Sequence, residues 1–110
     1  WLVSLPWNKK RKSKITDNII TRGWADPQNH SSITKGEPLE ARKFYEVTFD
    51  LMPDDQIIPK GQQIGLMIFS SDKEFTLWPK PGTELTINLD STTLNLPIVG
   101  GVEAFNSALK

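Results

Sequence analysis

Apolar and polar residues alternate along three stretches of the chain, and this period of two predicts β-strands. The stretches are Tyr45–Leu51, residues 84–89 and residues 93–98. Because successive side chains of a strand point to opposite faces, each stretch predicts a strand with one solvated face. Asp90 and Ser91 favour a turn between the last two stretches, so we expect a hairpin there.

Other segments have different hydrophobic patterns. Ile64–Phe69 is apolar except for Gly65, which predicts a strand covered on both faces, with Gly65 marking a bulge or a close backbone approach. Residues 1–7 and 15–24 predict two further strands. Residues 102–110 repeat apolar side chains at helical spacing and predict a short C-terminal helix.

Pro and Gly residues separate these segments at intervals that are typical of all-β sandwiches with long connections. At 110 residues the chain has the length of one modest domain, so residues 1–110 are predicted to be a single domain. The apolar fraction is 37%, and four Trp and five Phe concentrate it in a few large side chains. The predicted core is therefore feasible but thin.

The composition excludes several classes of protein. With no Cys in the sequence, disulfide scaffolds, thiolate zinc sites and Cys nucleophiles are excluded together. No apolar run approaches the roughly 18 to 20 residues of a membrane span. Residues 1–7 are too short for a signal peptide, and positive charge follows them instead of preceding them. A soluble protein without membrane contact is expected.

The formal net charge is zero, but its distribution is uneven because five of the thirteen basic residues fall within Lys9–Lys14. Such a cluster could bind nucleic acid or anionic lipid, since clustered cations release counterions from phosphates. It lies between Trp7 and Ile15, however, and includes Ser13, a composition typical of a solvated hairpin loop. We therefore predict no nucleic-acid partner.

The residues needed for hydrolytic catalysis are not found together in the sequence. A serine triad needs a base near a Ser that is exposed on a strained turn, yet the chain has one His, His30, and no G-x-S-x-G motif. The acidic pairs Asp54 with Asp55 and Asp72 with Glu74 could bind calcium if they converged, but neither belongs to a calcium-loop motif. We predict no catalytic residue, no metal site and no cofactor.

Three aromatic residues are the candidate ligand or interface residues. Trp24, Phe75 and Trp78 lie in or beside Pro-rich loops. Aromatic faces on a β-sandwich can stack on sugars or contact proline rings, and they can equally fill an interface between domains. A domain with neighbours in a larger protein is also expected to expose apolar surface where those neighbours pack.

Several motifs, in this order along the chain, resemble the C-terminal domain of the X-prolyl dipeptidyl peptidases, with a looser similarity to cocaine esterase and glutaryl acylase relatives. They cover most of the chain, from about Ile19 to Gly101. The motifs are Thr21–His30, Lys35–Leu39, Phe44–Tyr45, Phe49–Asp55, Ile58–Leu66, Phe75–Thr83 and Leu96–Gly101. Residues 1–14 match least, and the tail after Gly101 is unassigned.

The resemblance implies an all-β fold, a jelly-roll β-sandwich akin to galactose-binding-like domains, of which this chain holds the later strands. It further implies a position after an α/β-hydrolase serine peptidase domain in a cytoplasmic, homodimeric enzyme of lactic acid bacteria and related organisms. Such enzymes remove Xaa-Pro dipeptides from peptide N-termini, and their triad lies upstream of this domain. We therefore expect a non-catalytic structural module that packs on the catalytic domain and shapes access to its site. The alternative is a carbohydrate- or peptide-binding module.

Overall fold

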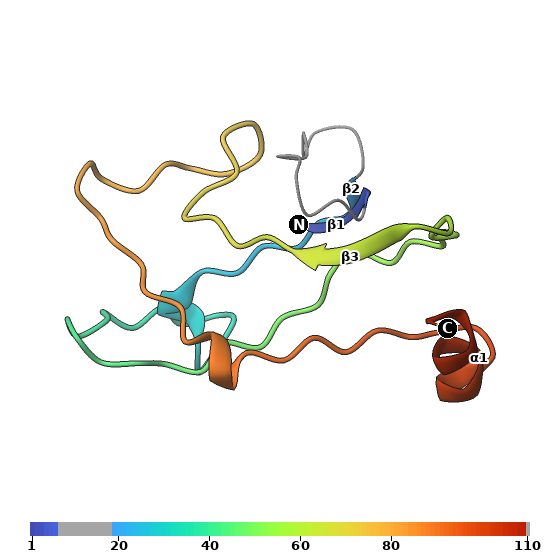
Figure 1. Cartoon of the computed structure of the whole chain (residues 1–110). Helices are drawn as coiled ribbons and strands as arrows, with labels where there is room; N and C mark the ends of the chain where they lie inside the picture. Colours follow the sequence, from blue (N-terminus) through green and yellow to red (C-terminus); the bar gives the residue numbers. More distant parts are fainter. Residues whose placement is uncertain (7–18, 110) are drawn as a thin grey trace. The chain divides into compact units, whose positions relative to one another are not determined.

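The computed structural model of the protein describes residues 1–6 and 19–109. They divide into two units, Trp1–Phe69 and Ser70–Lys110, which are described separately below. The first unit contains a three-stranded antiparallel sheet with strand order β2-β1-β3 (Figure 1). Its strands are β1 (Leu2–Pro6), β2 (Ile19–Thr21) and β3 (Gln62–Leu66).

The central strand β1 pairs with a segment that is distant in sequence. Leu2 lies opposite Leu66, and the register continues without interruption to the end of β1. The backbones of Trp1 and Met67 extend this ladder by exchanging hydrogen bonds of 2.7 and 2.9 Å. On its other side β1 pairs with β2, where the register shifts between Leu2 and Val3 in the manner of a β-bulge. The strand predicted over residues 1–7 is confirmed at Leu2–Pro6. Of the strand predicted over residues 15–24, Ile19–Thr21 is confirmed, residues 22–24 are not in a strand, and residues 15–18 lie outside the described part of the chain.

The buried part of the sheet is small and centres on β1. Val3 is fully buried and Leu2 is 5% exposed, and these are the buried hydrophobic residues among those described. The neighbouring Ser4 is also buried, and its hydroxyl hydrogen-bonds the side-chain amide oxygen of Gln62 across the β1–β3 pair. The buried hydroxyl of Ser4 therefore has a hydrogen-bond partner, as buried polar groups usually do.

Two glycines lie where neighbouring segments of the chain approach each other closely. A Cβ atom on Gly65 would lie 3.3 Å from Cγ2 of Val3, on the strand opposite. A Cβ atom on Gly23 would lie only 2.8 Å from the carbonyl oxygen of Asp50 and 2.8 Å from Cδ2 of Leu51. Gly65, where a bulge or a close backbone approach was predicted, shows neither: it lies in regular register and contacts the Val3 side chain. A close backbone approach occurs at Gly23, just after β2.

The strand predicted over residues 45–51 is not formed, although the chain there runs beside the end of β2. The amide of Met52 donates to Arg22 O at 2.8 Å, and the hydroxyl of Thr21 donates to Met52 O at 2.5 Å. Val47 and Leu51 are half-buried and the residues between them are exposed, so burial follows the apolar pattern only in part. The prediction was wrong because a strand needs a continuous ladder of backbone partners, whereas this segment has one backbone bond to the end of β2.

The segment Ile64–Phe69 was predicted to be covered on both faces, and this is also wrong. The strand ends at Leu66, and Ile68 and Phe69 are 47% and 45% exposed. An apolar run predicts a strand that is covered on both faces by other parts of the fold. Among the described residues, no second sheet covers the other face of β3.

The second unit contains the 3-10 turn η3 (Leu89–Ser91) and the helix α1 (Gly101–Ala108). The predicted turn at Asp90 forms, with Asn88 Oδ1 accepting from its amide at 3.1 Å, but residues 84–89 and 93–98 are not paired into a hairpin. The side chains of both segments are exposed, except that of Leu96, which is half-buried. The C-terminal helix is confirmed, and no helix among the described residues is long and apolar enough to cross a membrane.

Candidate interface surfaces

His30, the lone candidate base, belongs to a loop and contacts an aromatic ring. Its Nδ1 lies 3.2 Å from Pro27 O, and its ring packs edge-on against Tyr45 with the ring centroids 4.6 Å apart. Within the described part of the chain no hydrogen bond joins His30 to a Ser or to a carboxylate. The environment of His30 is that of a structural side chain.

The loop around His30 is held by its own hydrogen bonds. Asp26 caps the 3-10 turn η2 (Pro27–Asn29) by accepting from the amide of Gln28 at 2.9 Å. The side-chain amide of Asn29 donates to Ser32 O at 2.9 Å. These contacts are local and direct no reactive group toward a cleft.

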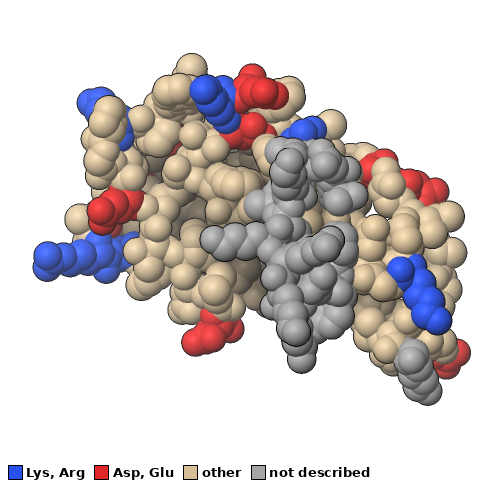
Figure 2. Space-filling view, turned by 45° about the horizontal axis from the view of Figure 1, so that its top comes forward, with Lys and Arg blue, Asp and Glu red and all other residues tan. Residues whose placement is uncertain are grey.

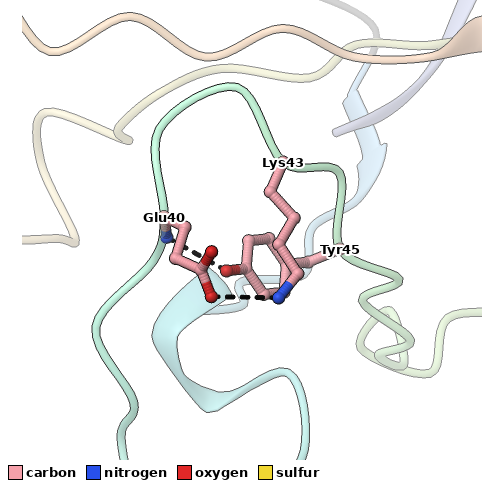
Figure 3. A network of polar contacts seen from close by, with 3 residues as sticks. All are labelled: Glu40, Lys43 and Tyr45. Atoms are coloured by element: carbon pink, nitrogen blue, oxygen red, sulfur yellow. Dashed lines mark hydrogen bonds and ion pairs between the residues drawn. The ribbon is translucent and has the colours of Figure 1, made fainter.

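A second cluster in this loop joins Glu40, Lys43 and Tyr45 (Figure 3). The Tyr45 hydroxyl accepts from the amide of Glu40 at 3.0 Å, and Nζ of Lys43 lies 3.0 Å from the Glu40 carboxylate. The same Nζ lies 5.3 Å from the centre of the Tyr45 ring. All these side chains lie on one loop, so the network fixes its conformation. An exposed ion pair of this kind contributes little to stability.

The two acidic pairs belong to different units, and the aspartates of each take part in a hydrogen-bonded turn. Asp54 accepts from the amide of Asp55 and from the side chain of Gln56, each at 3.0 Å, which is a turn arrangement. Asp72 is buried at the start of another turn, where its carbonyl accepts from Thr76. No group of three or more His, Asp or Glu residues in the described ranges could hold a metal ion.

The three candidate aromatics belong to different units. Trp24 follows β2 in the first unit and is 41% exposed, whereas Phe75 and Trp78 share one loop of the second unit and are 60% and 64% exposed. The structure thus places two of the three on the same loop. Their assignment as ligand or interface residues stays a prediction.

The loop that carries Phe75 and Trp78 begins with a hydrogen-bonded turn. Asp72 O accepts from the amides of Phe75 and Thr76 at 2.9 and 2.8 Å, and the Thr76 hydroxyl bridges back to the amide of Asp72 at 2.9 Å. Leu77, next to Trp78, is 96% exposed. Leu77 was not among the residues predicted from the sequence, although its place between two aromatics in a Pro-rich loop was an available signal.

An apolar groove of about 330 Å³ lies beside α1 in the second unit. It is bounded by side chains that alternation had assigned to a strand, together with one face of the helix. The lining residues are Leu94, Leu96, Ile98, Gly101, Val102 and Phe105. A groove with no charged or polar side chain in its lining suits apolar packing and not polar ligand recognition.

Figure 2 shows one face, on which basic and acidic side chains are dispersed among uncharged surface. The basic cluster Lys9–Lys14 lies outside the described residues, so its interpretation stays a prediction.

Comparison with known protein families gives one clear match. Residues 1–105 match the model of the X-Pro dipeptidyl-peptidase C-terminal non-catalytic domain. A protein from Rhodopirellula baltica, provisionally named a Xaa-Pro dipeptidyl-peptidase, is 66% identical over 92% of the chain. The Xaa-Pro dipeptidyl-peptidases of Lactobacillus helveticus and Streptococcus sanguinis are 34% and 29% identical over 79% and 87% of the chain.

The matched region is a small part of these relatives. It corresponds to 16% of the length of the Rhodopirellula protein, and to 10% and 12% of the Lactobacillus and Streptococcus enzymes. No solved structure matches the chain significantly.

Proposed function

The chain belongs to the X-Pro dipeptidyl-peptidase C-terminal non-catalytic domain family, and from this premise we propose that it packs on and stabilises the peptidase part of a longer polypeptide. The family is non-catalytic by its description, and no catalytic residue is assigned to any position here. The proposed role is structural, with a contribution to the shape of the entrance to the peptidase site.

The observation that carries this proposal is the imbalance between buried and exposed apolar side chains. Leu2 and Val3 are the buried hydrophobic residues among those described, while large apolar side chains of both units are exposed. Folded proteins bury most of their large apolar side chains, and exposed apolar surface usually contacts other protein. Packing against the remainder of a polypeptide accounts for the imbalance.

The open edge of the sheet supports a second part of the proposal, which concerns the fold. β3 pairs with β1 on one side and has no strand partner on the other among the described residues. An unpaired edge leaves backbone donors and acceptors available to a further strand. We propose that strands supplied by the same polypeptide complete a jelly-roll β-sandwich.

The finer features of the enzyme follow from the family resemblance. We propose that the polypeptide is an α/β-hydrolase serine peptidase that releases Xaa-Pro dipeptides, acts in the cytoplasm and forms a homodimer. The names of the relatives, which carry the Xaa-Pro dipeptidyl-peptidase designation, support the reaction. No cofactor is required by this proposal, since a serine triad uses protein groups alone.

Turnover of an Ala-Pro or Gly-Pro chromogenic substrate tests the non-catalytic role. The 110-residue chain alone is expected to show no cleavage, whereas the peptidase polypeptide that carries it should cleave the substrate. Removing the residues that correspond to 1–105 should lower the thermal midpoint of that polypeptide, because apolar surface of the peptidase part then meets water. Cleavage by the isolated chain, or a deletion that leaves the midpoint unchanged, would contradict the proposal.

The exposed aromatics favour one alternative, a carbohydrate- or peptide-binding module that uses Trp24, Phe75 and Trp78. Exposed indole rings can stack on sugars and on proline rings. Titrating intrinsic Trp fluorescence with sugars and Pro-containing peptides tests it. A saturable change in emission supports ligand binding, and unchanged emission at millimolar ligand excludes it.

A further inference from the structure

The loop of residues 72–78 combines a rigid base with an apolar tip. Its base is the turn in which Asp72 O accepts from the amides of Phe75 and Thr76 at 2.9 and 2.8 Å. Its tip carries Leu77, which is 96% exposed, and Trp78, which is 64% exposed. Exposed apolar side chains on a preordered loop lose little conformational entropy when they are buried by a partner.

Contacts within the loop also fix the orientation of the Trp78 ring. Its Nε1 donates to Lys73 O at 3.4 Å, and Nζ of Lys73 lies 5.5 Å from the ring centre. The indole donor is therefore engaged inside the loop, and one side of the ring faces a cation. What the ring presents outward is its remaining apolar surface.

These features suit a protein surface better than a sugar or a polar small molecule. A small-ligand site places a few converging polar groups around an apolar wall, and here the Trp78 donor already has a partner. Trp is enriched among the anchors that dominate protein interfaces, and the exposed Leu77 beside it adds apolar surface that a partner can bury. Lys73 beside the ring adds a positive charge that a carboxylate of the partner can complement.

We propose that Leu77 and Trp78 anchor this domain in an apolar pocket on the peptidase part of the same polypeptide, with an acidic side chain at the rim of the pocket facing Lys73. The inference rests on the proposed function. The partner is specified by the length comparison, since the chain corresponds to only 16% of the Rhodopirellula relative. A covalently attached partner is also present at a high effective concentration, so a small anchor suffices.

The test uses the full peptidase polypeptide with Leu77→Ser and, separately, Trp78→Ser. Loss of an interface anchor shifts a docking equilibrium by about 30-fold or more, so proteolytic cleavage between the domain and the peptidase part should accelerate by a similar factor. Leu77→Met should keep the wild-type rate because it preserves apolar volume. Lys73→Gln should accelerate cleavage and make it less sensitive to salt, because the attraction to the acidic rim is lost.

Val99→Ser is the matched control, since Val99 is 92% exposed in the same unit but lies outside the loop. Hydrogen exchange at the amides of Phe75 and Thr76 checks that the turn itself persists in each variant. Wild-type cleavage rates for Leu77→Ser and Trp78→Ser overturn the inference, and so does an equal effect of Val99→Ser. Loss of a sugar response in Trp78→Ser with docking unchanged also overturns it, in favour of a ligand site.

The domain deletion distinguishes failure of the proposed anchor from failure of the proposed structural role. If the deletion destabilises the peptidase while the loop variants behave as wild type, only the anchor is wrong. If the deletion has no effect, the structural role itself is wrong.

Discussion

Substitutions at Val3 and Gly65 give the sharpest check on the packing of the sheet, because each has a calculable effect and the effects are coupled. Gly65→Ala places a methyl group 3.3 Å from Cγ2 of Val3, closer than the roughly 3.5 to 4.0 Å of an optimal carbon contact. Overpacking costs about 1 to 3 kcal/mol, and the lower backbone entropy of Ala offsets about 0.5 to 1 kcal/mol. A net loss of about 1 kcal/mol is expected.

Val3→Ala removes side-chain volume from the same space into which Gly65→Ala adds a methyl group. It removes two methyl groups from a fully buried side chain, and the transfer term at about 0.8 kcal/mol per group is about 1.6 kcal/mol. The residual cavity raises the loss to about 2 to 3 kcal/mol. In the double variant the new methyl of residue 65 enters the space that Val3 vacates, so the combined loss should fall about 1 kcal/mol short of the sum.

Hydrogen exchange of the β1 and β3 amides, measured in the peptidase polypeptide, reports the local opening free energies that this cycle requires. Gly36→Ala is the control, because its Cβ would meet no atom nearer than 3.9 Å and its backbone is unstrained. It should change exchange by no more than a few tenths of a kcal/mol. Additivity of the Val3 and Gly65 effects within about 0.3 to 0.5 kcal/mol would refute the facing contact between the two residues.

Further predictions concern the loops of the first unit. Gly23→Ala places a methyl group 2.8 Å from Asp50 O, so one of the two chain segments must shift. The expected loss of about 1 to 3 kcal/mol of local stability should appear as faster hydrogen exchange of the Met52 amide. An unchanged exchange rate would contradict this close approach. Tyr45→Phe removes the acceptor of the Glu40 amide and should cost about 0.5 to 1.5 kcal/mol locally, read from exchange at Glu40; protection equal to that of the wild type would show that the hydrogen bond contributes nothing.

Local patterns predicted those elements whose partners lie within the chain. β1, β3 and the C-terminal helix follow from runs of apolar side chains. The backbone near Leu51 reaches only the end of β2, and residues 84–89 and 93–98 are not paired into a hairpin. Alternation predicts which side of a strand is apolar, but pairing also depends on a neighbour that alternation does not specify.

The candidate interface was predictable in part. Exposed aromatics in Pro-rich loops were found at Trp24 and Trp78 because large apolar side chains in loops have no core to enter. Leu77 was missed, although it lies between Phe75 and Trp78 in the same Pro-rich loop. The anchor role proposed for it depends on the turn at Asp72 and on the Trp78 ring beside it, both of which are properties of the folded loop.

The distant pairing of β1 and β3 has a consequence for biosynthesis. Trp1 and Met67, which close the end of this ladder, are 66 positions apart, and ribosomes add about 5 to 20 residues per second. The segment that will become the central strand therefore waits roughly 3 to 13 s after its own synthesis before its partner has been made. During that interval Leu2 and Val3 lack the strand opposite which they are buried, so the β1–β3 ladder cannot form until residues 62–66 have been synthesised.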